Sequence, residues 1–236
     1  SDVCSSDLIR MSNRDLKRIA LLLPNTDTIL ETDLQISLPS NIIIHTARMQ
    51  LDEVGKEAEK RMVDEELPRA VSALKHITNF DGAVFGCTSA SAVYGEEGLS
   101  RISRELEDGL DCPATNAFSA VLSEIRYFKA RRIGLLTPYT SEVNKFFTET
   151  LDRFGISCGA CHGLGISDDT RIARVEPQEI MEAAKQLEHE LKKQDLLLLS
   201  CTNLRAAEIR NAIGKMLELP VITSNQAIIN WILSAV

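Results

Sequence analysis

The sequence predicts an α/β protein in which short parallel strands alternate with helices. Short apolar runs bounded by turn residues recur along the chain, as at residues 19–23 and 196–199. Runs of this length, separated by amphipathic segments, are typical of buried parallel strands. Strands that alternate with helices through short links form parallel sheets with helices on both faces.

Each predicted element has a sequence reason. Apolar runs predict strands at 19–23, 42–48, 81–85, 112–115, 133–137, 156–161, 196–199 and 221–223. Apolar residues at helical spacing predict helices at 55–77, 96–110, 116–127, 142–154, 177–191, 201–217 and 225–233. Pro68 is tolerated near a helix start, Asn116 and Ser141 are suitable N-caps, and Gly155 ends a helix.

An internal repeat indicates two similar domains. Cys87-Thr88 and Cys201-Thr202 are 114 residues apart, and so are Pro24 and Pro138, each in a polar loop that ends a strand. A repeat this long is unlike a solenoid, whose periods are much shorter. We expect one domain from 11–116 with 224–236, and a second from 117–223. Residues 1–10 fit no element and are interpreted as a leader or scar.

Composition narrows the class of protein. The 236 residues carry a net charge of −8, with 25% charged and 44% hydrophobic residues, as in ordinary globular domains. An acidic chain lacks the basic face that binds nucleic acid. No apolar run approaches about 18 residues and no signal peptide is evident, so we expect a cytoplasmic protein without a membrane span.

The remaining cysteines, His45 and the glycine-rich loop are expected to have structural rather than catalytic roles. The cysteines are Cys4, Cys87, Cys112, Cys158, Cys161 and Cys201, and a cytoplasmic chain keeps them reduced. The CxxC at 158–161 is interpreted as two buried thiols, because one such pair cannot complete a zinc site. His45, at a strand end, is expected to satisfy local hydrogen bonds rather than to catalyse. The loop at 163–170 lacks the dinucleotide fingerprint. No metal and no cofactor are expected.

Cys87 and Cys201 are the candidate catalytic residues. Each follows a predicted strand at a strand-to-helix turn, where unpaired backbone N–H groups point outward. Such a turn favours anions, so it is expected to lower a thiol pKa and to hold a substrate carboxylate. Two matching sites suggest one active site with two facing thiols. The alternative is that both cysteines are core residues.

Two facing thiols support two reactions. One thiolate can remove a proton from carbon while the other thiol delivers one to the opposite face, which is racemisation or epimerisation. Alternatively, a thiolate adds to an activated alkene and rotation before elimination converts cis to trans. Both routes pass through an enolate-like charge that the N–H groups after each cysteine can bind.

Four motifs carry a family resemblance: FGCTS at 85–89, LTPY at 136–139, IARVEP at 172–177 and SCTNL at 200–204. They resemble the aspartate/glutamate racemase superfamily, especially maleate cis–trans isomerases, ectoine-utilisation proteins and arylmalonate decarboxylases, over nearly all of residues 11–236. The first cysteine argues against a decarboxylase, which keeps only the second. The resemblance implies two pseudosymmetric Rossmann-like domains with the site between them, no cofactor, and a homodimer or higher oligomer.

The resemblance also implies roles for individual residues. Cys87 would be the nucleophile or first acid/base, Cys201 its partner, and Tyr139 a donor to a substrate carboxylate. The remaining expected substrate-binding residues are Asn25, Asp27, Thr88, Ser89, Thr140, Asp168, Thr202 and Asn203.

Asp27 departs from the family pattern because it replaces a substrate-binding asparagine, and a second family asparagine falls near Asp168 and Asp169. An ionised aspartate would repel a dicarboxylate but accept hydrogen bonds from an ammonium or hydroxyl group. Alternatively, Asp27 caps a helix or faces away.

We therefore expect a cofactor-independent isomerase of a small mono- or dicarboxylic acid, most like maleate isomerase. An amino-acid or N-acyl-amino-acid racemase is the alternative within enzymes. A protein that binds a small acid without turnover is the alternative outside them.

Overall fold

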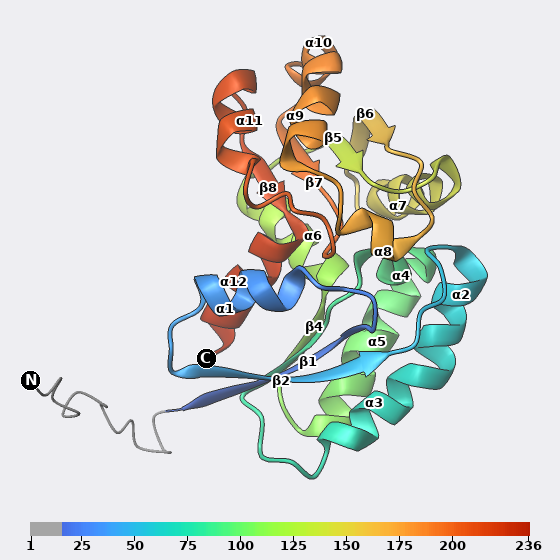
Figure 1. Ribbon diagram of the computed structural model, residues 1–236, viewed down its shortest axis with the longest axis vertical. Helices are drawn as coiled ribbons and strands as arrows, with labels where there is room; N and C mark the ends of the chain where they lie inside the picture. The colour runs from blue at the N-terminus through green and yellow to red at the C-terminus, as the bar shows by residue number, and fades with distance from the viewer. Residues whose placement is uncertain (1–15) are drawn as a thin grey trace, which may run out of the picture.

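The computed structural model describes residues 16–236, which form two four-stranded parallel sheets (Figure 1). The first sheet contains β1 (Lys17–Pro24), β2 (Ile42–Met49), β3 (Gly82–Phe85) and β4 (Ala114–Asn116) in the order β2-β1-β3-β4. The second contains β5 (Arg132–Thr137), β6 (Ser157–Gly163), β7 (Leu196–Leu199) and β8 (Val221–Thr223) in the order β6-β5-β7-β8. The predicted fold class and all eight strands are confirmed, and the equivalent strand orders reflect the internal repeat.

The helices of the first half differ from expectation in two places: the helix at Leu30–Ser37 was not predicted, and the helix expected at 55–77 is divided. They are α1 (Leu30–Ser37), α2 (Lys56–Arg61), the π-helix η1 (Met62–Glu66), α3 (Leu67–Leu74), α4 (Thr88–Val93) and α5 (Gly95–Leu110). The helix expected at 55–77 is therefore divided by a π turn, in which the Leu67 N–H bonds the Met62 carbonyl. Pro68 follows directly, and a residue without an N–H cannot continue the α-helical ladder there.

The second half contains α6 (Ala117–Tyr127), α7 (Ser141–Arg153), α8 (Asp169–Ile172), α9 (Pro177–Gln186), α10 (Glu188–Leu191), α11 (Arg210–Leu217) and α12 (Ser224–Ala235). The prediction of a helix starting at Cys201 is wrong, because residues 201–209 form turns before α11 begins. Asn116 caps α6 as expected, since its side chain accepts from the Ser119 N–H at 2.9 Å. The N-cap of α7 is Thr140 rather than Ser141.

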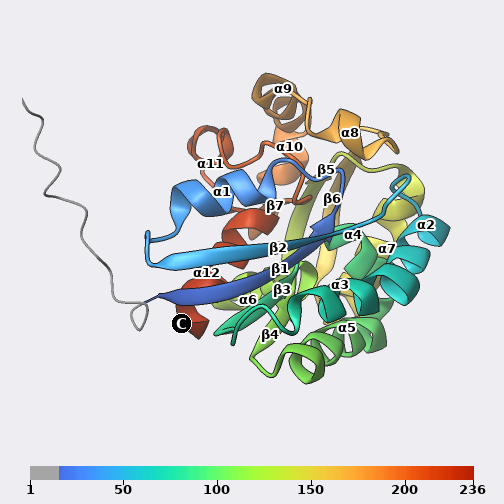
Figure 2. The same cartoon turned by 60° about the horizontal axis from the view of Figure 1, so that its bottom comes forward.

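Helices α6 and α12 connect the two sheets. α6 follows the last strand of the first sheet, α12 follows the last strand of the second, and the two helices pack against each other (Figures 1 and 2). α12 also packs against α1 and β3 of the first half. The domain boundaries given above stay a prediction, and the leader expected at residues 1–10 lies outside the described residues.

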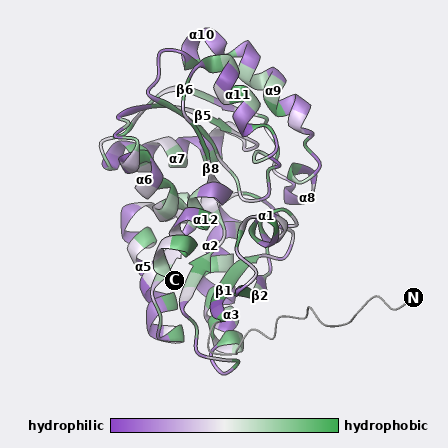
Figure 3. Ribbon diagram, turned by 90° about the vertical axis from the view of Figure 1, so that its left-hand side faces the viewer, coloured by the Kyte–Doolittle hydropathy of each residue, from purple (hydrophilic) through white to green (hydrophobic). Residues whose placement is uncertain are grey.

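The core is continuous between the halves. One buried apolar cluster includes Ile19 and Val84 from the first sheet and Leu197 from the second. A second cluster lies under α3 and α5, with Ala83 and Leu106 among its members. Figure 3 shows the strands of the first sheet as mainly hydrophobic and the outer helices as mixed. Within residues 16–236, no helix combines the length and the apolar character needed to cross a membrane.

Candidate active site

The two cysteine turns come from different sheets and touch each other. Cys87 lies beyond the end of β3 and is the N-cap of α4, whereas Cys201 lies beyond the end of β7. The hydroxyl of Thr202 donates to the Gly86 carbonyl at 3.2 Å, so the residue after one cysteine bonds the residue before the other. The carboxyl edges of the two sheets therefore meet at the cysteines.

A second buried link joins the same turns. The Thr88 hydroxyl donates to the Ser224 hydroxyl at 3.1 Å, and Ser224 lies 3.2 Å from the Ser200 hydroxyl. Cys87 and Cys201 are only 4% and 5% exposed. The loop after β2 closes against the second half, where the Val54 N–H donates to the Ser167 carbonyl at 2.8 Å. The structure therefore shows a closed site from which water is largely excluded.

Each sulfur has donors that favour its thiolate, as expected for these turns. Ser89 Oγ lies 3.7 Å from Cys87 Sγ, and the Ala90 N–H also favours the Cys87 thiolate. The Tyr139 hydroxyl and the Asn203 N–H have the same effect on Cys201.

The expectation of lowered thiol pKa values is nevertheless wrong for this closed structure. Burial raises the pKa of both thiols above the usual value, and the Glu59 carboxyl adds to this at Cys87. Asp169 and Asp27 raise the pKa of Cys201 further. Burial in this closed structure therefore favours the protonated form of both thiols, and a nearby positive charge would favour the thiolate.

Tyr139 connects the two cysteines. It is 1% exposed, and its pKa is raised well above the usual value by burial, by its contact with Cys201, and by electrostatic interaction with Cys87 and Glu59. One phenol thus lies within electrostatic range of both sulfurs. This position makes Tyr139 a neutral hydrogen-bond donor in the centre of the site.

Asp27 has the capping role considered for it, and its expected contact with substrate stays a prediction. Its Oδ1 accepts from the N–H groups of Ile29 and Leu30 at 3.0 Å each, which caps the start of α1. Its Oδ2 is buried with no hydrogen-bond partner in the described part of the chain. Burial raises the pKa of Asp27 to about 6. One oxygen is therefore structural, while the other has only the Thr202 hydroxyl nearby to favour the ionised form.

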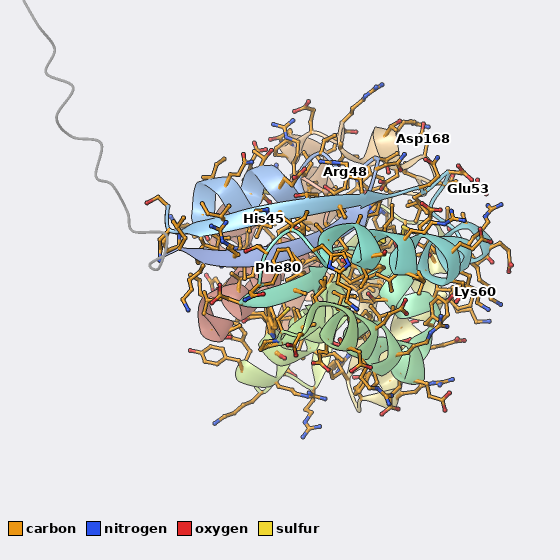
Figure 4. The ribbon with its side chains drawn as sticks, turned by 90° about the horizontal axis from the view of Figure 1, so that it is seen from below. His45, Arg48, Glu53, Lys60, Phe80 and Asp168 are labelled. Atoms are coloured by element: carbon orange, nitrogen blue, oxygen red, sulfur yellow. The ribbon has the colours of Figure 1, made fainter. Side chains whose placement is uncertain are left out.

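Asp169, rather than Asp168, occupies the buried position in this loop. Asp168 is exposed, and its carboxylate accepts from the Thr170 N–H at 3.0 Å at the start of α8 (Figure 4). Asp169 is 6% exposed, and its Oδ2 accepts from the Thr26 hydroxyl at 2.5 Å. Asp169 is therefore the buried carboxyl group of this loop, and the substrate contact expected at Asp168 stays a prediction.

Two further residues expected to bind substrate, Asn25 and Thr140, form no hydrogen bond with Cys87 or Cys201 in the part of the chain that the structure describes. Asn25 is exposed, and its amide bonds Gln50 and the Leu51 N–H, at 3.2 and 3.1 Å. Thr140 is half-buried at the start of α7, and no contact with either cysteine is observed.

The Asn203 amide ties loops together. Its Oδ1 accepts from the Thr28 N–H at 3.0 Å, and its Nδ2 donates to the carbonyls of Asp169 and Thr26 at 2.9 and 3.4 Å. With both donors occupied, this side chain positions the loops of both sheets rather than presenting a free amide.

Glu59 is a buried carboxyl group that was not predicted from the sequence. This residue lies on α2, is 0% exposed, and neither carboxylate oxygen has a hydrogen-bond partner among the described residues. Burial raises its pKa to about 8, an effect that the nearby Ser89 hydroxyl only partly offsets. The sequence did contain an indication of this burial. Glu59 lies on the apolar face of its helix with Ala58 and Met62, where a charged residue is unusual.

The other polar candidates lie away from the cysteines. His45 on β2 packs edge-on against Phe80 and lies 3.3 Å from an Arg18 nitrogen, which agrees with its structural interpretation (Figure 4).

Cys158 is half-buried and Cys161 is exposed, so the expectation of two buried thiols is wrong for Cys161. Over residues 16–236, no group of three or more His, Cys, Asp or Glu side chains is arranged to hold a metal ion.

Each of the two parallel sheets contributes one buried cysteine to the place where the sheets meet. The protein is therefore an α/β protein with a pair of buried cysteines between its two sheets. The family model for arylmalonate decarboxylase matches residues 21–235, nearly the whole chain. This protein therefore belongs to the arylmalonate decarboxylase and maleate isomerase family of the aspartate/glutamate racemase superfamily. The resemblance predicted from the four motifs is confirmed.

Curated relatives and solved structures agree with this assignment. The maleate isomerase of Geobacillus stearothermophilus is 25% identical over 92% of this chain and 91% of its own length. The arylmalonate decarboxylase of Bordetella bronchiseptica is 26% identical over 59% of this chain and 58% of its own. A maleate cis–trans isomerase mutant from Nocardia farcinica, solved with a covalently bound succinylcysteine intermediate, has a TM-score of 0.86 at 20% identity. The match covers 93% of this chain and 92% of that one.

Proposed function

We propose that this protein is a cofactor-independent isomerase of a small carboxylic acid that uses Cys87 and Cys201 as its acid/base or nucleophilic pair. The observation that supports this most strongly is the contact between the two cysteine turns through Thr202 and Gly86. Tyr139, which acts on both sulfurs, adds to it. Neither feature is needed if the cysteines only fill space in the core.

Proton transfer needs one thiolate and one thiol on opposite faces of the substrate. The thiolate removes the proton from the carbon next to the carboxylate, and the other cysteine returns a proton to the opposite face. The second cysteine is left as the thiolate, ready for the reverse direction. Thr88, Ser89 and Thr202 supply hydroxyl groups at the turns, and the N–H groups after each cysteine favour developing negative charge.

The cis–trans reaction uses the same pair differently. One thiolate adds to the double bond, the negative charge moves onto the adjacent carboxylate, and the other thiol protonates the carbon. Rotation about the new single bond and loss of that proton with the thiolate then give the trans acid. The relatives named maleate isomerase favour this reaction. Racemisation of an amino acid is the second candidate, favoured by the buried carboxyl groups of Asp27 and Asp169.

Cys87→Ser tests the proposal. The substitution should lower turnover at least 100-fold, because a serine hydroxyl is a far weaker acid and nucleophile than a thiol at neutral pH. Fumarate formation from maleate and deuterium exchange at the α-carbon of amino acids, both followed by NMR, separate the two reactions.

Cys112→Ser is the matched control, because Cys112 precedes β4, whereas Cys87 follows the parallel strand β3, so the two cysteines lie at opposite edges of the first sheet. Unchanged rates in Cys87→Ser would remove the proposed role. The expected homodimer also stays a prediction, which the mass in solution tests.

A further inference from the structure

Glu59 is a buried carboxyl group with no structural partner. It lies at 0% exposure on α2, where neither oxygen has a hydrogen-bond partner of good geometry in the described residues and the Ser89 hydroxyl is the one nearby donor that favours its ionised form. Native structures leave very few buried polar atoms unpaired, and a buried acid without a partner is costly to keep. The position is therefore unexplained by the fold alone.

The surroundings of Glu59 are those of the active site. Ser89 is near enough to favour its ionised form, and its charge acts on Cys87 and on Tyr139. α2 packs directly against α4, the helix that Cys87 caps. Glu59 therefore belongs to the side of the site formed by the first cysteine.

The charged groups that act most strongly on this site are all acidic. Asp169 acts on Glu59 from the start of α8, and Asp27 acts on Cys201 from the loop after β1. The basic residues of α2 are not among the groups that act most strongly on Glu59 or Cys87. Lys56 stacks over the Phe146 ring at 5.4 Å, Arg61 lies 3.5 Å from Asp52, and Lys60 is half-buried. Arg48 donates to the Asp27 carbonyl but forms its ion pair with Glu31. No cation is among the groups that act most strongly on the carboxyl groups of Glu59, Asp27 and Asp169.

We propose that Glu59 binds the cationic nitrogen of the substrate, and that the substrate is an α-amino acid whose ammonium lies beside Cys87. This inference rests on the proposed function of the two cysteines and specifies its substrate class. An ammonium group offers three donors to carboxylate oxygens that lack a partner of good geometry. A dianion without a cation would instead be placed among three carboxyl groups.

The same cation would supply the charge that the thiols lack. An ammonium near Cys87 and Glu59 favours the ionised form of both groups, which counters the effect of burial. The thiolate would then form only when the substrate is bound. The hydroxyl and N–H donors at the turns remain free to hold the substrate carboxylate.

The test compares matched acids with and without the nitrogen. Aspartate and glutamate, with malate and 2-hydroxyglutarate as nitrogen-free counterparts and maleate as the alkene, are incubated with the full chain in D2O. E59Q removes the charge and keeps the shape, and E59D keeps the charge. E57Q is the control, because Glu57 is an exposed residue on the same helix.

We expect E59Q to lower kcat/KM for the amino acid on the order of 10–100-fold through a raised KM, since hydrogen bonds to charged groups are lost. E59D should retain part of the kcat/KM that E59Q loses, and E57Q should have the kcat/KM of the wild type. Exchange with the nitrogen-free acid should not fall in E59Q. Equal losses for both acids, or wild-type turnover of maleate alone, would overturn the inference and leave the two-cysteine function intact.

If no acid is turned over, binding measurements still test the role of Glu59 separately from the isomerase function of the two cysteines. Calorimetry with 2-methylaspartate, which has no α-proton, against its 2-hydroxy counterpart measures the role of Glu59 without chemistry. Selective binding of the amino acid that E59Q loses would support the inference while the isomerase function fails. Equal or absent binding of the amino acid would overturn it.

Discussion

At the scale of single residues, Glu59 has a consequence for stability. Its folded-state pKa is about 8, against an ordinary value of 4.5, because burial penalises the charged form. Between these two pH values the folded protein holds a proton that the unfolded chain releases. Stability therefore falls as pH rises from about 4.5 to 8.

E59Q should remove most of that dependence. We expect the variant to unfold like the wild type near pH 5 and to be more stable near pH 9, by on the order of 4 kcal/mol as an upper value. Urea unfolding followed by circular dichroism at several pH values measures this. Asp27, whose pKa is raised to about 6, leaves a smaller slope of the same sign. Parallel pH curves for E59Q and the wild type would contradict the assignment.

Tyr139 should matter for the chemistry more than for the fold. Removal of its hydroxyl in Tyr139→Phe takes away a donor that favours the Cys201 thiolate, so the pKa of that thiol should rise. We expect turnover to fall roughly 10–100-fold, with the limb of the pH–rate profile that reports thiol ionisation moved to higher pH. Tyr127→Phe is the control, because Tyr127 is 78% exposed. An unchanged profile in Tyr139→Phe would contradict this role.

The sequence predicted the cysteines and Tyr139 in one site, but not the state of ionisation there. Thiol pKa values depend on how completely loops from both sheets cover the sulfurs, and a linear pattern carries no measure of that coverage. Asp168 and Asp169 are adjacent, and only the turn that starts α8 decides which is buried. Glu59 was visible as a charge on an apolar stripe, but its neighbours Ser89 and Cys87 come from another element.

At the scale of elements, the strands could be predicted because each is a short apolar run in a doubly covered sheet. β3 and β7 are fully buried along their lengths. The loop after Cys201 was wrongly predicted as helix, because its composition is compatible with a helix. Its actual course follows from contacts that Thr202 and Asn203 make with the other half.

Helix α1 was missed and depends on a cap that can be tested. Asp27 Oδ1 accepts two N–H groups of the first turn, so Asp27→Ala should cost about 1 kcal/mol of unfolding free energy. Asp27→Asn keeps an oxygen acceptor and should lie close to the wild type. Urea unfolding at pH 5, below the pKa of about 6, compares uncharged side chains. Equal losses in both variants would show that the cap contributes little.

At the scale of the whole molecule, the repeat predicted two similar halves with strand ends in equivalent places. It could not predict that α6 and α12 pack across the junction, since helix pairing between halves leaves no periodic signal. The continuous apolar cluster that includes Ile19 and Leu197 makes the halves one packed unit. The site is therefore stable only if the loops of both sheets hold one relative position.

Asn203 is the residue on which that position depends most. Its amide bonds Thr28 and Thr26 from the first half and Asp169 from the second, at 1% exposure. Asn203→Ala leaves the part-buried Thr28 N–H and the carbonyls of Thr26 and Asp169 without this partner, which should cost on the order of 2–3 kcal/mol. Asn203→Asp retains the acceptor but loses both donors and adds a charge beside Asp169, so it should be at least as destabilised at pH 8.

Denaturant unfolding measures these losses, with Asn211→Ala as the control because Asn211 is exposed on α11. The Asn203 variants should also lose turnover beyond their loss of stability, since the loops carrying Asp27 and Cys201 would no longer be held together. Stability within 0.5 kcal/mol of the wild type in Asn203→Ala, a range typical of surface substitutions, would show that other contacts align the halves. Thr202, whose hydroxyl reaches Gly86, would then be the residue to substitute next.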